Sequence, residues 1–257
     1  MRQATLERQQ RVLIQVLDKK HVTVKDLATN MAVSEATVRR DLKTLADSQK
    51  VALIHGGAML PKETDFSFFA KRDRNTSAKM MIGQLAALMV TDGDQIFLDS
   101  GTTCFEMARC LSGKRSLSVI VNSARVALEL QAPSMKVIML GGQYRPERMD
   151  TVGPITMATL EQLRGFVAFI GADGLSMDFG PAAVDMESAH LYRLAVANAR
   201  ETVLLVDHTK FQAPSLFKIV DWEKISCLVT DEEPSLEWRE FFERRNIKAY
   251  YPSMLSK

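Results

Sequence analysis

The sequence has few cysteines, few histidines and few aromatic residues. Of 257 residues, three are cysteine, four are histidine and 7% are aromatic. Cys104, Cys110 and Cys227 show no CxxC spacing, and the histidines lie far apart along the chain, so the sequence predicts no structural zinc site. We expect the three thiols to be small buried residues rather than metal ligands or nucleophiles. We expect no cofactor, no bound metal and no catalytic residue.

Long apolar runs are also lacking. The longest ones, such as Phe166–Ile170 and Thr202–Val206, are far shorter than the roughly 20 residues that cross a bilayer. The N-terminus, Met-Arg-Gln-Ala-Thr-Leu-Glu-Arg, has no apolar signal-peptide core. Both absences, together with the small number of cysteines, predict a cytoplasmic protein with no membrane partner. The length of 257 residues is enough for two domains, one small and one of average size, and 46% hydrophobic residues allow a sizeable core.

Positive charge is concentrated in the first quarter of the chain. Residues 1–60 contain ten lysines and arginines against six acidic residues, a net charge of +4, whereas the rest of the chain carries −2. A basic head on a nearly neutral body is typical of a nucleic-acid-binding domain, but a difference of this size also arises by chance. The charge therefore needs a motif beside it before it can indicate DNA.

The first sixty residues contain three helical patterns. Apolar residues recur at helical spacing over Thr5–Lys19 and again over Val24–Met31, with a short β-type run at His21–Val24 between them. After a break, Ser34 can cap a third helix, with Glu35 favourably placed in its first turn. Two short helices joined by a tight turn predict a helix-turn-helix over about residues 22–41.

The third helix has one apolar and one polar face, and a hairpin follows it. Val38, Leu42 and Leu45 recur at i, i+4 and i+7. The opposite face carries Glu35, Thr37, Arg39, Arg40 and Lys43. Over residues 50–60, two β-prone runs flank His55-Gly56-Gly57, which predicts a wing whose tip reaches a groove or a phosphate. This order of elements predicts DNA binding far better than any single element does.

At this point the sequence resembles the DeoR family of bacterial regulators. The residues that carry the resemblance are 24–28, Val-Lys-Asp-Leu-Ala; 33–42, Val-Ser-Glu-Ala-Thr-Val-Arg-Arg-Asp-Leu; and 55–58, His-Gly-Gly-Ala. In the family, the second stretch is the recognition helix. The resemblance implies that DNA is contacted by Ser34, Glu35, Ala36, Thr37, Arg39, Arg40, Lys43 and His55. We expect Asp41 to orient an arginine or to brace the fold rather than to touch DNA.

The segment over residues 61–77 is predicted to be a linker between a DNA-binding domain (1–60) and a larger domain (78–257). It is polar at both ends but carries Phe66, Phe68 and Phe69, which a disordered linker would rarely do. We expect these rings to dock on the second domain or on a partner subunit, and a helix to follow over Ser77–Val90.

The rest of the chain alternates apolar runs with helical patterns. The predicted strands are Gln95–Leu98, Leu117–Val121, Lys136–Leu140, Phe166–Ile170, Thr202–Val206, Ile225–Val229 and Ile247–Tyr251. The predicted helices are Thr103–Leu111, Ala124–Leu130, Ile155–Leu163, Met186–Ala199 and Leu236–Arg244. The alternation predicts an α/β domain, a doubly wound and mostly parallel sheet covered on both faces.

Five predicted strands end in small, acidic, hydroxyl or cationic residues. Ligands of such sheets bind at the carboxyl ends of the strands. The five ends are 99–103, Asp-Ser-Gly-Thr-Thr; 122–123, Asn-Ser; 141–142, Gly-Gly; 171–174, Gly-Ala-Asp-Gly; and 207–211, Asp-His-Thr-Lys-Phe. The first suits a phosphate, because a helix N-terminus follows it. Such residues also end strands merely because they form turns, so the ends are moderate evidence for a polyol phosphate.

The resemblance to the DeoR family extends over these strand ends and therefore over nearly the whole chain. It implies a sensor domain that is similar to ribose-5-phosphate isomerase and glucosamine-6-phosphate deaminase, and an effector that is a phosphorylated sugar or sugar acid. By analogy, Ser100, Gly101, Thr102 and Thr103 hold the phosphate, and Asp99, Asp173, Glu187 and Lys210 read the sugar. Asn122, Gly141 and Gly171 complete the implied site.

The chain departs from the family pattern in two places. Val121 stands where threonine usually precedes Asn122. The loop over 180–187, Gly-Pro-Ala-Ala-Val-Asp-Met-Glu, lacks the usual threonine and contains a proline. Effector specificity could therefore differ from that of other members.

The favoured function is a repressor of a carbohydrate-utilisation operon, released from double-stranded operator DNA by the effector and acting as a homodimer or a larger homo-oligomer. One alternative is a sugar-phosphate isomerase or deaminase with a DNA-binding head, in which Lys210 and the carboxylates transfer protons. It is disfavoured because no histidine or carboxylate pair stands at a fixed short spacing. The other alternative is an activator, which the sequence does not separate from a repressor.

Overall fold

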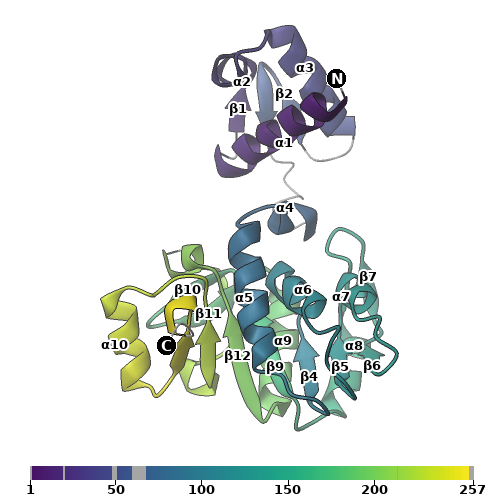
Figure 1. Ribbon diagram of the computed structural model, residues 1–257, viewed down its shortest axis with the longest axis vertical. Helices are drawn as coiled ribbons and strands as arrows, with labels where there is room; N and C mark the ends of the chain where they lie inside the picture. The colour runs from purple at the N-terminus through teal and green to yellow at the C-terminus, as the bar shows by residue number, and fades with distance from the viewer. Residues whose placement is uncertain (1, 20, 48–50, 60–67, 213, 255–257) are drawn as a thin grey trace. The chain divides into compact units, whose positions relative to one another are not determined.

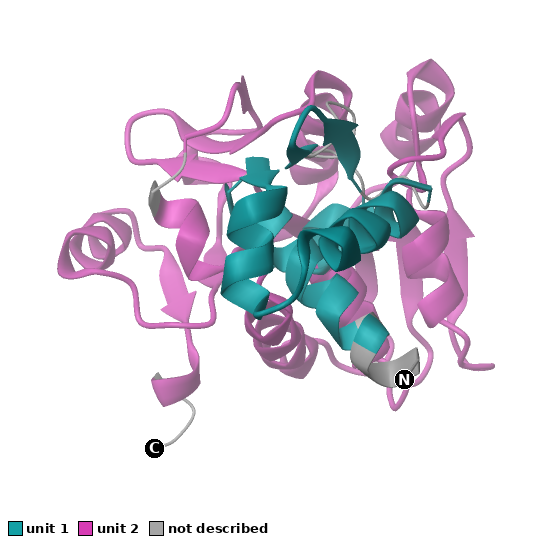
Figure 2. Ribbon diagram, turned by 90° about the horizontal axis from the view of Figure 1, so that it is seen from above, with its two compact units in different colours: residues 1–74 teal, residues 75–257 magenta. Residues whose placement is uncertain are grey.

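The computed structural model describes residues 2–19, 21–47, 51–59, 68–212 and 214–254 (Figure 1). The chain divides into two compact units, Met1–Arg74 and Asn75–Lys257, which Figure 2 colours separately. Among the helices of the described ranges, none combines the length and the apolar composition that a membrane crossing requires. Each unit is described by itself below.

The first unit is a winged helix-turn-helix. Its elements are α1 (Arg2–Lys19), β1 (His21–Thr23), α2 (Val24–Met31), α3 (Glu35–Asp47), β2 (Ala52–Ile54) and β3 (Gly57–Met59). The strands form an antiparallel sheet in the order β1-β3-β2. The predicted helix-turn-helix and hairpin are confirmed, and the structure adds that β1 pairs with the hairpin.

Two adjacent glycines allow this small sheet to form. Gly56 has φ +76° in the two-residue loop between β2 and β3, a conformation that residues with a Cβ rarely adopt. Gly57 lies so close to β1 that a Cβ atom there would stand 2.1 Å from the carbonyl oxygen of Val22. The first glycine permits the turn, and the second permits the close pairing of β1 with β3.

A small apolar core fills this unit. The buried residues on the helices include Val12 and Val16 of α1, Leu27 of α2, and the three residues predicted on α3: Val38, Leu42 and Leu45. Three helices that each bury one apolar stripe can be stable at this size only together, because a single short helix is marginal in water. The basic face of α3 is thereby turned outward.

A short helix, α4 (Phe68–Arg72), occupies part of the segment predicted to be a linker. Ala70 packs against the core of the first unit. Phe68 is buried, Phe69 is half-exposed, and their rings meet edge to face at 5.9 Å. Phe66 lies outside the described residues. The docking of these aromatic rings on the second domain or on a partner stays a prediction.

The second unit is built on a seven-stranded parallel sheet. The strands are β4 (Gln95–Leu98), β5 (Ser118–Val121), β6 (Lys136–Met139), β9 (Val167–Gly171), β12 (Glu201–Leu205), β14 (Cys227–Val229) and β15 (Lys248–Tyr250). Their order is β15-β14-β12-β9-β4-β5-β6. All seven predicted strands are confirmed, and every neighbouring pair is parallel.

Helices cover both faces of this sheet (Figure 1). One face is covered by α5 (Thr76–Leu88), α6 (Thr102–Arg109) and α7 (Ala124–Glu129), and the other by α8 (Pro154–Glu161), α9 (Met186–Asn198) and α10 (Leu236–Arg244). The strands are apolar on both sides because both faces are covered. Aromatic rings of Trp222, Trp238, Phe241 and Phe242 pack edge to face at the α10 side of the core.

Short strands that the sequence did not reveal lie beyond the main sheet. They are β7 (Gln143–Arg145) with β8 (Asp150–Val152), and β10 (Gly174–Ser176) with β11 (Gly180–Ala183) and β13 (Phe217–Lys218). Short 3₁₀ segments, η2 (His208–Gln212), η3 (Trp222–Lys224) and η4 (Pro252–Met254), complete the unit. Strands of two to four residues carry too few positions for a periodic signal.

The prediction that all three cysteines are buried is wrong for Cys110. Cys104 and Cys227 are buried, whereas Cys110 follows the last residue of α6 and is exposed. Burial raises the pKa of Cys227 to about 12, so this thiol stays protonated at neutral pH.

The packing of α5 on α6 gives a first prediction. A Cβ atom on Gly83 of α5 would lie 2.7 Å from backbone atoms of Glu106 and Met107 in α6. Alanine favours a helix over glycine by about 1 kcal/mol, but overpacking a closed interface costs about 1–3 kcal/mol. We expect Gly83→Ala to lower the free energy of unfolding by about 1–2 kcal/mol in urea denaturation.

The matched control for this substitution is Gly113→Ala, because no atom lies within 4 Å of a Cβ placed at Gly113. We expect the control to leave the free energy of unfolding unchanged or slightly raised. Equal stability of the Gly83→Ala protein and the wild type would show that the two helices can separate at no cost.

Candidate functional site

The helix-turn-helix is closed by side-chain caps and a tight turn. Thr23 accepts a hydrogen bond from the Asp26 amide at 3.1 Å and caps α2. Ala32, with φ +53°, ends α2 in the left-handed conformation. Ser34 Oγ then accepts from the Thr37 amide at 3.2 Å, which confirms the predicted cap of α3. The start of α3 is therefore fixed where base edges would be approached.

The residues predicted to touch DNA form one accessible face. Those that are exposed are Ser34, Glu35, Ala36, Arg39, Arg40, Lys43 and His55, whereas Thr37 is half-buried. Arg39 pairs with Glu35 at 3.2 Å on the same face, so its guanidinium is partly engaged. The Arg40 side chain has no hydrogen-bond or ion-pair partner within the described part of the chain.

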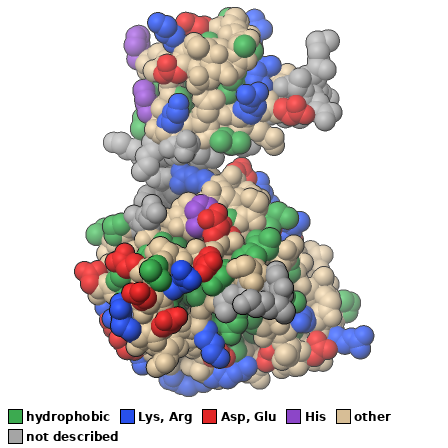
Figure 3. Space-filling view, turned by 60° about the vertical axis from the view of Figure 1, so that its left-hand side comes forward, with side chains coloured by type: hydrophobic (Ala, Val, Ile, Leu, Met, Phe, Trp, Pro, Cys, Tyr) green, Lys and Arg blue, Asp and Glu red, His purple; other side chains and the backbone are tan. Residues whose placement is uncertain are grey.

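The basic character of this unit is visible at its surface. Lysine, arginine and histidine side chains lie on the side of the first unit that Figure 3 shows, beside a few acidic ones. An exposed, unengaged arginine on a capped helix is what either bidentate contact with guanine or contact with a phosphate requires.

Asp41 lies on the buried side of α3 and joins this helix to α1. Its side chain is 4% exposed and accepts hydrogen bonds from Arg8 Nε at 2.6 Å, Arg8 Nη2 at 3.2 Å and Gln9 Nε2 at 3.2 Å. The prediction that Asp41 braces the fold is confirmed. The three residues of the Arg-Arg-Asp motif therefore have different roles: the two arginines face solvent, and the aspartate faces α1 and joins the two helices.

In the second unit, the polar strand ends meet at the point where the strand order reverses. β4 lies between β5, which follows it in the chain, and β9, which begins the other half of the sheet. Asp99 follows β4 and is 1% exposed. Its Oδ1 accepts from the Gly101 amide at 2.6 Å and its Oδ2 accepts from the Gly171 amide. Asp99 thus ties together the loops after β4 and β9.

This arrangement bears on the predicted role of Asp99. Burial raises its pKa, although the two amide groups act in the opposite direction. Both carboxylate oxygens are used inside the protein. The nearby Gly101 has no room for a Cβ, which would lie 2.8 Å from Asp99 Oδ1. Asp99 therefore holds the loops after β4 and β9 in shape.

The predicted phosphate loop begins helix α6. Ser100, Thr102 and Thr103 are buried, and Gly101 supplies no side-chain cap. The amide groups of Thr102, Thr103 and Cys104 have no acceptor within the described ranges. The start of α6 therefore offers free N–H groups, and its macrodipole favours a negative charge there.

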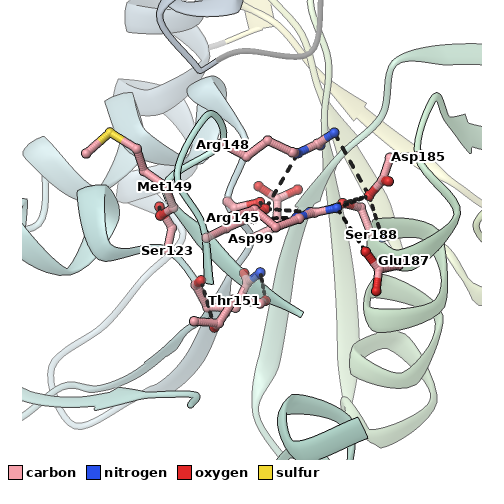
Figure 4. A network of polar contacts seen from close by, with 12 residues as sticks. Asp99, Ser123, Arg145, Arg148, Met149, Thr151, Asp185, Glu187 and Ser188 are labelled. Atoms are coloured by element: carbon pink, nitrogen blue, oxygen red, sulfur yellow. Dashed lines mark hydrogen bonds and ion pairs between the residues drawn. The ribbon is translucent and has the colours of Figure 1, made fainter. Parts of the chain in front are cut away.

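A buried carboxylate, Asp150, connects this loop to the hairpin formed by β7 and β8. Figure 4 labels two arginines of this hairpin, Arg145 and Arg148. Asp150 is fully buried and accepts from Ser100 Oγ at 2.9 Å. Arg145 donates to it through Nε and Nη2, both at 2.8 Å. Tyr192 OH lies 3.0 Å from Ser100 Oγ and extends the network to α9.

Arg145 also reaches the start of α9. Its Nη1 donates to Asp185 Oδ2 at 2.8 Å and lies 3.5 Å from Glu187 Oε2. Asp185 caps α9 by accepting from Ser188. Burial opposes ionisation of Asp185, but the hydrogen bonds from Ser188 and Arg145 outweigh it and lower its pKa to about 2. A second arginine, Arg148, lies beside Arg145 in Figure 4.

The remaining strand ends are engaged within the fold. Asn122 donates to the Thr151 carbonyl oxygen at 3.1 Å, and its buried Oδ1 has no partner in the described ranges. The Gly141 carbonyl oxygen accepts from Thr156 at 2.7 Å. Asp173 accepts from the Val184 amide at 3.0 Å and so joins the loop after β9 to the 180–187 loop.

Lys210 lies in η2, after β12, and is half-buried. Burial opposes ionisation of the neighbouring Asp207, but Lys210 and the hydrogen bonds from Thr209 lower its pKa. Asn75 also donates to Asp207, at 3.2 Å. No hydrogen bond or ion pair of the described residues joins Lys210 to the Asp150 network.

One group of side chains in the described ranges has the spacing of metal ligands. The donor atoms of His208, Asp231 and Glu232 lie within 4.8 Å of one another. Asp231 accepts from the His208 amide at 2.8 Å and lies 2.7 Å from its Nδ1, which raises the pKa of His208. This contact joins the loops after the neighbouring strands β12 and β14.

The predicted site residues are thus brought together only in part. Asp99, Ser100, Gly101 and Gly171 contact one another directly, and Glu187 reaches them through Arg145. The residues that the sequence did not reveal are Arg145, Arg148, Asp150, Asp185, Ser188 and Tyr192. The available signal was the pair of arginines and the aspartate over 145–150, which follow Gly141-Gly142 at a strand end.

A winged helix-turn-helix followed by a parallel α/β domain defines a class of two-domain proteins in which a larger domain follows a DNA-binding domain along the chain. Residues 8–64 match the DeoR-like helix-turn-helix domain, and residues 74–232 match the DeoR C terminal sensor domain. The second match covers more than half of the chain. The chain therefore belongs to the DeoR family, and it is a DNA-binding transcriptional regulator rather than an enzyme.

Curated relatives match over most of both chains. The HTH-type transcriptional repressor CsqR of Escherichia coli is 29% identical, over 95% of this chain and 95% of the relative. The lactose phosphotransferase system repressor of Lactococcus lactis is 31% identical, over 86% and 89%. The glycerol-3-phosphate regulon repressor of Escherichia coli is 27% identical, over 83% and 86%.

Solved structures resemble the second unit only remotely. Ribose 5-phosphate isomerase A of Methanocaldococcus jannaschii is 19% identical, over 53% of this chain and 54% of that chain, with a TM-score of 0.39.

The Asp150 network gives a second prediction. Removing one partner of a buried ion pair leaves an uncompensated charge and costs about 3–5 kcal/mol. We expect Arg145→Met to lower the free energy of unfolding by about 3 kcal/mol at neutral pH. The difference should shrink as pH falls from about 4 to 2, because the lowered pKa of Asp185 contributes stability only above that range.

The measurement is urea denaturation followed by circular dichroism at a series of pH values, with Arg244→Met as the control. Arg244 is exposed on α10 and lies 4.0 Å from Glu240, so its loss should change stability by less than about 0.5 kcal/mol. A penalty at Arg145 no larger than at Arg244 would contradict a structural role for the network.

Proposed function

We propose that the chain is a repressor of a carbohydrate-utilisation operon, released from its operator by a phosphorylated sugar or sugar acid. The observation that carries the DNA half is the exposed and unengaged Arg40 on the capped helix α3. The names of the relatives support repression, rather than activation, and a role in carbohydrate use, since they include repressors of a lactose system and of a glycerol-3-phosphate regulon.

The sensor half of the proposal rests on the edge of the sheet where the loops after the paired strands β4 and β9 meet. Free amide groups at the start of α6 suit a phosphate. Glu187 has a half-exposed carboxylate that can accept hydrogen bonds from sugar hydroxyls, and Lys210 offers a half-buried ammonium. A phosphorylated polyol is the ligand class that combines an anionic group with several hydroxyls.

Release of DNA requires that the effector prefer one state of the protein. A ligand that binds the DNA-competent and the DNA-incompetent state equally well shifts nothing. We propose that the effector binds the incompetent state better, and that the protein acts in the cytoplasm as a homodimer or a larger homo-oligomer, because helix-turn-helix heads read repeated half-sites in pairs.

Arg40 provides the test of DNA contact. An arginine contact to a base or phosphate contributes enough that Arg40→Ala should weaken operator binding about 10- to 100-fold. Affinity is measured by fluorescence anisotropy at fixed salt, on a fragment that the wild-type chain has selected from random DNA. Urea denaturation should show an unchanged free energy of unfolding, because the Arg40 side chain makes no hydrogen bond or ion pair with the described residues.

Two variants serve as controls for this test. Arg244→Ala removes the same charge from the second unit and should bind the operator as the wild type does. Asp41→Asn breaks the bond to Arg8 and should lower stability. Operator binding by Arg40→Ala that equals the wild type would contradict the proposed recognition face.

The sensor half predicts that a sugar phosphate binds and releases DNA. A ligand at 100 times its Kd that binds only the folded protein stabilises it by about 2.7 kcal/mol, which raises the melting temperature measurably. We expect at least one compound in a panel of pentose, hexose and triose phosphates to raise the melting temperature and to lower operator affinity. Their unphosphorylated parents should do neither.

Repression and activation are distinguished by the expression of a reporter gene placed downstream of the operator. Deletion of the regulator should raise expression if the chain is a repressor and lower it if the chain is an activator. Operator affinity that is unchanged by every phosphate that binds would contradict release by the effector and would leave DNA binding intact.

A further inference from the structure

The hairpin formed by β7 and β8 carries two arginines that use their guanidinium groups differently. Arg145 is 14% exposed and donates four hydrogen bonds of 2.8–3.1 Å to Asp150, Asp185 and Ser188. Arg148 is 15% exposed, yet it forms no hydrogen bond with the described residues. The carboxylate oxygens that it approaches are 3.7 Å away on Asp150 and 3.9 Å away on Asp185.

The difference matters because a half-buried guanidinium that makes no hydrogen bond can gain strong, charge-assisted ones from a ligand. Arg148 does not obtain such bonds from its two neighbours. Asp150 Oδ2 already accepts from Arg145 and Ser100, and Asp185 Oδ2 already accepts from Arg145 and Ser188. Arg148 is therefore a half-buried cation that has two ion-pair partners but whose N–H donors make no hydrogen bond with the described residues.

The position of Arg148 indicates where such a ligand would lie. The same Asp150 oxygen is 2.9 Å from Ser100 Oγ and 3.7 Å from Arg148 Nε, so the arginine is next to the loop that begins α6. Figure 4 shows its side chain extending alongside Arg145 toward Asp185. Burial and nearby Asp99 raise the pKa of the Tyr192 phenol, while the charge of Arg148 acts in the opposite direction, as expected of a close cation.

The carboxylates around Arg148 also interact with other groups. Asp185 and Glu187 stand at the start of α9, whose N-terminal amide groups and macrodipole favour carboxylates. Asp150 and Asp185 are each paired with Arg145. The start of α6 has no carboxylate in its first turn, and the burial of Asp99 favours its neutral form. An anion placed between α6 and Arg148 thus meets the positive end of the α6 macrodipole on one side and a guanidinium on the other.

We propose that Arg148 is the side-chain ligand of the effector's phosphate group, facing the free amides at the start of α6. Arg145 is a positioning residue, which holds the hairpin through Asp150 and Asp185 so that Arg148 faces Ser100. This inference rests on the proposed function, since it names the residue that makes a phosphorylated effector distinguishable from its parent sugar. A guanidinium can bind two phosphate oxygens at once.

The experiment uses the full chain and the phosphate from the panel that raises its melting temperature most, together with inorganic phosphate and the parent sugar. Kd values are measured by titration calorimetry for the wild type, Arg148→Met, Arg148→Lys and the control Arg244→Met. We expect Arg148→Met to raise the Kd of the sugar phosphate about 10- to 100-fold, which is the range for lost hydrogen bonds to a charged group. The Kd of Arg148→Lys should lie between those of Arg148→Met and the wild type, and the Kd of Arg244→Met should equal that of the wild type.

Stability separates a ligand from a structural residue. The ligand-free Arg148→Met protein should melt within about 2 °C of the wild type, because no hydrogen bond of the described fold is lost and Asp150 and Asp185, which each lose a longer ion pair, keep their pairing with Arg145. If this variant melts much lower, Arg148→Lys, which keeps the charge, supplies the affinity comparison. The inorganic phosphate arm should show the same order of variants at weaker affinity, and the parent sugar should show no difference between them.

The outcomes distinguish this inference from the function on which it rests. Binding of the sugar phosphate by both Arg148 variants with the wild-type Kd overturns the role of Arg148 and leaves the proposed effector class standing. If no phosphate of the panel binds the wild type, the effector class fails, and the role of Arg148 fails with it. Equal loss of affinity for the phosphate and for its parent sugar would also overturn the inference, because Arg148 would then not read the phosphate.

Discussion

The fully buried carboxylate of Asp150 is the interaction on which the polar edge of the second unit depends. A carboxylate removed from water persists only if hydrogen bonds and an opposite charge compensate it. Arg145 supplies the charge and Ser100 a hydroxyl, and Arg145 also binds Asp185, so three separate segments meet at one point. The loop that begins α6, the β7–β8 hairpin and the start of α9 are consequently held in one arrangement.

The first unit uses the same device at a different scale. Asp41 is buried on α3, and the arginine that compensates it, Arg8, comes from α1. In both units a buried aspartate paired with an arginine fixes the element that carries the candidate binding groups: Asp41 and Arg8 are 33 residues apart, whereas Asp150 and Arg145 share one hairpin. The cost of an unpaired buried carboxylate makes each arrangement specific, because an alternative packing would leave the charge uncompensated.

The two units differ in what they leave unsatisfied. On α3, Arg40 is exposed to solvent and keeps its hydration until a partner displaces the water. At the sheet edge, Arg148 is half-buried, and the amide groups at the start of α6 have no acceptor within the described ranges. A binding group kept partly out of water is prepared for a ligand at some cost in stability, and this trade-off is a common feature of functional sites.

The sequence by itself determined the fold class and most of its elements. Apolar periodicity located the seven strands of the main sheet within two residues at either end, because strands covered on both faces are apolar throughout. The caps, the glycines of the wing and the apolar stripe of α3 followed from local rules that act over a few residues. These signals are local, so one sequence suffices to read them.

Only the tertiary structure decided which polar residues meet. Strand ends such as Asp99 and Gly171 could be placed at one edge from the topology. The sequence did not show that both carboxylate oxygens of Asp99 accept hydrogen bonds from backbone amides. Arg145, Arg148 and Asp150 lie in a hairpin too short to give a periodic pattern, and their partners on α9 are about 40 residues away. Long-range hydrogen bonds between charged groups depend on burial, which is a property of the folded chain and not of any local stretch of it.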